Sequence, residues 1–109
     1  MFVGTTAIGI CYEVIKPEYR ELVKERVERF HDVIEIKKEQ LLDFCGNCLE
    51  IPDKDGNLLL AMSTAAFNAY TELQKVKIEK HFKKIVHTDI STIEKYGGGS
   101  ARCMLAELF

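Results

Sequence analysis

The sequence lacks an excess of positive charge and lacks any long apolar run. Its 15 Lys and Arg residues are interspersed with 17 Asp and Glu residues, which gives a formal net charge of −2. A protein that neutralises nucleic-acid phosphates needs a basic stripe, so we expect no nucleic-acid partner. No apolar stretch is long enough to span a bilayer, so we expect no membrane partner either.

The sequence also has few cysteines and no feature of a secretory signal. The opening run, residues 1–12, is uncharged, but it has no basic n-region and is rich in Thr, Val, Ile and Gly, which is typical of strand. Four cysteines without such a signal are expected to be reduced thiols. These features predict a cytoplasmic protein. Its 109 residues, 47% of them hydrophobic, are enough for one domain, residues 1–109, with its own core.

Apolar periodicity in the first half predicts a strand, a helix and a second strand. Residues 6–15 are rich in strand-forming residues, and Pro17 suits the first turn of a helix that runs to about Phe30. Apolar residues recur in that helix at three- and four-residue spacing. They are Tyr19, Leu22, Val23, Val27 and Phe30. A short strand over residues 33–36 and a helical turn or two over residues 41–44 follow.

The second half predicts a similar order of elements. A hairpin over residues 48–62 turns at the Gly-containing segment 53–57. Helical residues 63–82 contain a capping box, Thr71 with Gln74, and a strand over residues 84–87 follows. Ser91 with Glu94 predicts another capping box for a helix that ends at residues 97–99. The apolar residues 101–109 predict a buried strand.

The two halves align with each other, which indicates a repeat. At an offset of 51 residues Tyr19 meets Tyr70 and Leu22 meets Leu73, and after one inserted residue Phe30 meets Phe82. We interpret the chain as two β-α-β units, about residues 1–44 and 45–96, followed by a cysteine-bearing strand, residues 100–109. The alternative is that any two amphipathic helices align at some offset. Both interpretations predict an α/β fold with helices covering sheets.

The loop at residues 97–100, followed by Arg102 and Cys103, is the segment most typical of a functional site. Glycines let backbone N–H groups approach a ligand, and a nearby cation with oriented N–H groups lowers the pKa of a thiol. We expect Cys103 at the entrance of a strand, with the backbone of residues 97–100 close to its sulfur. The alternative is structural: the glycines end a helix, and Cys103 is a small buried hydrophobe.

The Cys45-Gly46-Asn47-Cys48 segment is a CxxC motif, which invites a redox or zinc interpretation. A reactive CxxC lies at a helix N-terminus, whereas this one follows a helix and leads into a strand. A zinc site would need two further ligands, and only Cys11 and Cys103 remain. We therefore expect Cys45 and Cys48 to lie on a strand, with neither a disulfide nor a metal ion between them. We also expect the protein to bind no cofactor.

The segment from Gly97 to Met104, with the letters GGGSARCM, resembles the C-terminal motif of the amidinotransferase (pentein) superfamily. The resemblance is closest to its citrulline utilisation hydrolase branch. Residues 44–51 (FCGNCLEI), 62–68 (MSTAAFN) and 85–89 (IVHTD) extend it over nearly the whole chain. It implies a partial pentein-type fan of two β-α-β units with mixed sheets and covering helices.

The resemblance implies a covalent thiol chemistry. Cys103 stands where the superfamily keeps a nucleophile that attacks the carbon of a guanidino or ureido group, as in citrulline or arginine. Gly98, Gly99, Ser100 and Arg102 are the loop residues expected to contact such a small substrate. Carboxylates that hold the substrate and a histidine that moves protons complete the superfamily's site.

The resemblance places that histidine and those carboxylates upstream of Met1, so we expect the chain alone to be inactive. His31, His81 and His87 are instead expected to be ordinary surface or strand-end residues. A second hypothesis is a catalytically inactive module that binds a protein partner or forms a homo-oligomer through exposed strand edges, because unpaired backbone groups recruit another chain.

Overall fold

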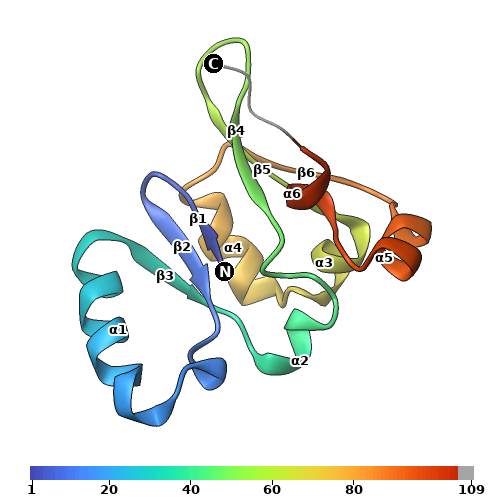
Figure 1. Ribbon diagram of the computed structural model, residues 1–109. Coiled ribbons are helices and arrows are strands. Elements are labelled where there is room, and N and C mark those ends of the chain that lie inside the picture. Colours follow the sequence, from blue (N-terminus) through green and yellow to red (C-terminus); the bar gives the residue numbers. More distant parts are fainter. Residues whose placement is uncertain (106–109) are drawn as a thin grey trace.

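The computed structural model describes residues 1–105, in which strands and helices alternate (Figure 1). The first half contains β1 (Phe2–Val3), β2 (Ala7–Ile10), the 3-10 turn η1 (Tyr12–Val14), α1 (Pro17–Phe30), β3 (Asp32–Glu35) and α2 (Lys38–Leu41). The second contains β4 (Leu49–Pro52), β5 (Leu58–Ser63), α3 (Thr64–Ala69), α4 (Glu72–Glu79), β6 (Lys84–Thr88), α5 (Ser91–Gly97) and α6 (Ala101–Met104). None of the helices in residues 1–105 could cross a membrane, since none is both long and apolar enough.

The described residues form two sheets with one topology, so the expected α/β fold with mixed sheets is confirmed. The strand orders are β1-β2-β3 and β4-β5-β6; in each, the first pair is antiparallel and the second is parallel. Ala7 pairs with Asp32 in the first sheet, and Leu59 pairs with Lys84 in the second. Both residues of the second pair lie 52 positions after their counterparts in the first pair. The parallel strands therefore repeat with the same register.

Local sequence signals explain most of the element boundaries. Pro17 occupies the first turn of α1, as expected. Thr71 and Gln74 form the predicted capping box of α4. The predicted long helix over residues 63–82 is divided, because α3 ends at Ala69, Tyr70 is extended, and α4 ends at Glu79.

One hydrophobic core joins the two units. Its buried members come from both sheets and from the helices of the second unit, among them Phe2, Ile34, Leu60, Met62, Ile78 and Phe82. Gly4 lets the Phe82 ring approach the first unit, because a Cβ at position 4 would lie 3.1 Å from that ring. Apolar burial of this kind supplies most of the driving force for folding.

Candidate functional site

Cys103 lies in α6, a single helical turn, and its side chain is exposed. The prediction of a strand over residues 101–109 is therefore wrong for residues 101–104, and residues 106–109 lie outside the described residues. Ala, Arg and Met are strong helix formers, and Asn47 supplies acceptors for the unsatisfied N–H groups of the turn. The Arg102 N–H donates to the Asn47 carbonyl at 3.4 Å.

Asn47 also contacts the sulfur and the backbone of Cys103 directly. Its Nδ2 donates to the Cys103 Sγ at 3.1 Å, and its Oδ1 accepts from the Cys103 backbone N–H at 3.3 Å. The turn after α2 aims this side chain, since the Asn47 N–H donates to the carbonyl of Phe44, which has a positive φ of 64°. Our sequence reasoning missed Asn47, although it lies within the segment that attracted attention for its two cysteines.

The glycine loop lies against the Cys103 thiol, as expected. Gly98 ends α5 in the left-handed region, with φ of 70°, a conformation that glycine adopts without strain. A Cβ at Gly99 would lie 3.1 Å from the Cys103 Cβ and 3.3 Å from its Sγ. A side chain at position 99 would therefore crowd the sulfur, and the neighbouring atoms would have to shift by a few tenths of an ångström.

Ser100 is buried and anchors this loop. Its Oγ donates to Glu94 Oε2 at 2.7 Å, and the Glu94 side chain is also buried. The predicted capping box of Ser91 and Glu94 is wrong, because Glu94 turns inward to Ser100, while Asp89 Oδ1 accepts from the Ser91 N–H at 2.9 Å. Ser100 thus presents its backbone to the site and its hydroxyl to the interior.

The surroundings of Cys103 favour its thiolate. The hydrogen bond from Asn47 is the main cause that lowers the pKa of Cys103 below its ordinary value, followed by a hydrogen bond from the Ser100 backbone, and the Arg102 charge adds to both. Hydrogen bonds to a charged form stabilise that form. A thiolate is the nucleophilic form of cysteine, so the geometry is suited to attack on an electrophile.

The other cysteines have different environments. Cys45 and Cys48 are fully buried, and burial raises the pKa of each thiol to about 12. The expectation that this segment is strand is wrong, because Cys45 lies in a turn and β4 begins only after Cys48, at Leu49. Both cysteine side chains reach the same core. The Tyr70 hydroxyl donates to the Cys45 carbonyl, and Cys11 is buried as well.

The three histidines lie in other parts of the structure. His81 Nε2 is 2.8 Å from Asp32 Oδ2, while His87 stacks on Phe67 with 4.1 Å between ring centroids. His31 follows α1 and lines a cleft. Among residues 1–105, none of the hydrogen bonds to Cys103 comes from a histidine.

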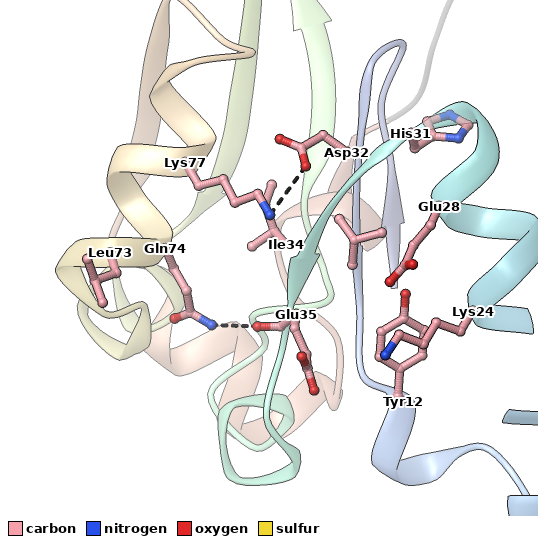
Figure 2. A pocket seen from close by; sticks show the side chains of 11 residues that line it. Tyr12, Lys24, Glu28, His31, Asp32, Ile34, Glu35, Leu73, Gln74 and Lys77 are labelled. Atoms are coloured by element: carbon pink, nitrogen blue, oxygen red, sulfur yellow. Dashed lines mark hydrogen bonds and ion pairs between the residues drawn. The ribbon is translucent and has the colours of Figure 1, made fainter. Parts of the chain in front are cut away.

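Cys103 does not line either of two clefts that the described residues form. A cleft of about 550 Å³ lies between α1, β3 and α4 and is lined by Tyr12, Glu28, Asp32 and Lys77, among others (Figure 2). An apolar cleft of about 250 Å³ is lined by Ala101 and Met104 of α6, but not by Cys103. Cys103 is nevertheless the candidate site, because it is exposed and has hydrogen-bond donors at its sulfur, as a reactive thiol needs.

One protein family matches this chain over its whole length. The family model for N,N dimethylarginine dimethylhydrolase, eukaryotic, matches residues 1–109. A search of curated proteins and a search of solved structures each found no match. The matched family is part of the pentein superfamily, in agreement with the resemblance of the GGGSARCM segment.

Proposed function

The chain belongs to the N,N dimethylarginine dimethylhydrolase family, and from this we propose that it carries the nucleophile, Cys103, of a hydrolase acting on a guanidino or ureido group. The observation that supports this role is the pairing of Cys103 with Asn47. The exposed thiol has hydrogen-bond donors that lower its pKa, whereas burial raises the pKa of Cys45 and Cys48.

The chemistry of the substrate explains why such a thiol is needed. The carbon of a guanidino group is bonded to three nitrogens and is resonance-stabilised, so its C–N bonds break slowly without a strong nucleophile. The Cys103 thiolate forms an S–C bond to this carbon. The C–N bond to the leaving nitrogen then breaks, and that nitrogen takes a proton and departs as a neutral amine.

Water completes the reaction. It adds to the same carbon and loses its protons as the C–S bond breaks, which restores the thiolate and leaves a ureido product from a guanidino substrate. In this scheme Asn47 Nδ2 and the Ser100 backbone stabilise the thiolate before attack and after release. Preorganised donors do so without the cost of reorienting water.

Two substrate classes fit this proposal. The family description names dimethylarginine, which has a guanidino group, whereas the motif segments resemble the citrulline utilisation branch, whose substrate has a ureido group. Both groups present one carbon bonded to three heteroatoms to the thiol. The proposal therefore covers both, with dimethylarginine, arginine and citrulline as the compounds to compare.

The test is product release by the natural polypeptide that carries these 109 residues. Dimethylamine and ammonia are measured with dimethylarginine, arginine and citrulline, for the unsubstituted protein, for Cys103→Ala and for Cys11→Ala as the matched control. We expect Cys103→Ala to lower turnover by about a thousandfold or more, since a nucleophile acts as one unit with its partners. Turnover retained by Cys103→Ala, or no release from any substrate by the unsubstituted protein, would overturn the proposal.

A further inference from the structure

The cleft between α1, β3 and α4 contains a buried hydroxyl that has no partner. Tyr12 lines this cleft and is only 6% exposed. Of the buried side-chain polar atoms in residues 1–105, only the Tyr12 hydroxyl has no hydrogen-bond partner. Figure 2 shows it directed toward the Glu28 carboxylate, with which it forms no hydrogen bond. Because buried polar groups are normally hydrogen-bonded, this hydroxyl points to a ligand that supplies the bond.

The backbone of Tyr12 is held in place by α1. Tyr12 opens the 3-10 turn η1, and the Arg20 side chain reaches back to this turn. Arg20 Nε donates to the Tyr12 carbonyl at 3.0 Å, and its Nη2 donates to the Ile15 carbonyl at 3.0 Å. The hydroxyl is therefore positioned before a ligand arrives, which lowers the ordering cost of binding.

The charges around the Tyr12 hydroxyl are negative. Glu28 of α1 and Glu35 of β3 both line the cleft, whereas the ion pairs found in residues 1–105 use other carboxylates. Burial raises the pKa of Tyr12 above its ordinary value, and the charges of Glu28 and Glu35 raise it further. Because nearby negative charge favours a positive group, this end of the cleft is suited to a cation.

The two lysines of the cleft agree with a cationic ligand. Lys24 Nζ lies 5.9 Å from the centre of the Tyr12 ring, so the ring face is open to a positive group. Lys24 is exposed, so its ammonium can return to solvent when a ligand enters. Lys77 lies 3.3 Å from Asp32 and is therefore already paired, which leaves it less suited to hold an anion. The cleft volume of about 550 Å³ is typical of small-molecule sites.

We propose that this cleft binds a small organic cation with N–H donors between Tyr12, Glu28 and Glu35. The N–H groups donate to the Tyr12 hydroxyl oxygen and to the two carboxylates. A guanidinium and a primary ammonium share this chemistry, and the planar guanidinium can also stack on an aromatic ring. The site is separate from Cys103: neither Cys103 nor its partner Asn47 lines the cleft, and α1 and α6 lie apart in Figure 1. It does not depend on the proposed hydrolase function.

The experiment is a titration of the natural polypeptide that carries these 109 residues, followed by the backbone amide chemical shifts. The probes are methylguanidinium and methylammonium, with tetramethylammonium as a cation without N–H donors and acetate as an anion. Two variants change the site: Tyr12→Phe, and Glu28→Gln combined with Glu35→Gln. Tyr19→Phe and Glu25→Gln are the matched controls, because both residues are exposed on α1 and neither lines the cleft.

We expect one or both of the N–H cations to shift the amides of the cleft, and the stronger binder identifies the preferred group. Tyr12→Phe and the double glutamine variant should each weaken this binding about tenfold, the loss expected for a hydrogen bond to a charged group, while the controls bind as before. Urea unfolding should show no loss of stability in Tyr12→Phe, since only an unpartnered hydroxyl is removed.

Three results would overturn the proposal. The first is unchanged binding in Tyr12→Phe, which would leave the hydroxyl without a role in the cleft. The second is equal or tighter binding of tetramethylammonium or acetate, which would show that N–H donors on a cation are not selected. The third is the absence of shifts at the cleft with either N–H cation.

Discussion

Asn47 holds Cys103 with both ends of its amide: Nδ2 donates to the sulfur at 3.1 Å, and Oδ1 accepts from the backbone N–H at 3.3 Å. The two residues are 56 positions apart in the sequence. One side chain therefore fixes the helical turn that carries the thiol and also stabilises the thiolate.

Replacing Asn47 should raise the pKa of Cys103. Asn47→Ala removes the donor to the sulfur, and Asn47→Asp retains an acceptor for the Cys103 N–H but places a negative charge beside the thiolate, so the rise should be larger. The measurement is the rate of Cys103 alkylation by iodoacetamide against pH, read by peptide mass spectrometry. Asn57→Ala in the β4–β5 turn is the control. An unchanged pH profile in both Asn47 variants would contradict this role.

The glycine at position 99 should be needed for thiol reactivity. Gly99→Ala places a Cβ 3.1 Å from the Cys103 Cβ, so α6 or the loop has to move. We expect slower alkylation of Cys103 at every pH. The control is Gly97→Ala, whose Cβ would meet the Ile93 methyl group at an ordinary 3.8 Å. Equal alkylation rates in the two variants would show that the close approach at position 99 has no effect.

Ser100 should matter for stability through Glu94. Ser100→Ala leaves the buried Glu94 side chain without its donor, which typically costs about 2 kcal/mol of unfolding free energy. Ser91→Ala is the matched control, because Ser91 is exposed and does not cap α5. Urea unfolding of the three chains gives the comparison. Equal losses in both variants would contradict a structural role for the buried hydrogen bond.

Asp32 should make the contact between the two units dependent on pH. The hydrogen bond with His81, together with Lys77, lowers the pKa of Asp32 below its ordinary value. A carboxylate whose pKa is lower in the folded than in the unfolded state stabilises the fold at pH values above the unfolded-state pKa. This stabilisation is lost as the pH falls through the folded-state pKa.

Asp32→Asn should therefore be less stable than the unsubstituted chain near neutral pH, by up to about 1 kcal/mol for so exposed a pair. The difference should disappear in strong acid. Urea unfolding at several pH values measures it, with Asp55→Asn in the exposed β4–β5 turn as the control. A loss that persists unchanged in acid would assign the effect to packing instead of charge.

Local sequence signals predicted the elements whose causes are local. The helix that begins at Pro17, the hairpin around Gly56 and the capping box of Thr71 all depend on residues a few positions apart. The internal alignment predicted that strand, helix and strand recur, and the parallel strand pairs of the two sheets have one register that repeats 52 residues later. Such patterns are enough to predict the fold class and much of the topology.

Contacts between distant residues were not predictable in this way. Residues 101–104 are apolar enough to suggest strand, but acceptors from Asn47 favour a helical turn. Glu94 has the spacing of a capping residue from Ser91, yet the buried Ser100 hydroxyl binds it instead. Neither outcome follows from the local sequence, because the partner that decides it becomes a neighbour only in the folded chain.

The most direct test of the account is the pKa of the Cys103 thiol in the unsubstituted protein. Its alkylation rate is measured against pH in the folded chain and in the same chain unfolded by urea, with peptide mapping to separate it from the other cysteines. The account predicts a lower midpoint in the folded chain, with Cys103 modified well before the buried Cys45 and Cys48. A midpoint equal to or above that of the unfolded chain would contradict Cys103 as an activated nucleophile.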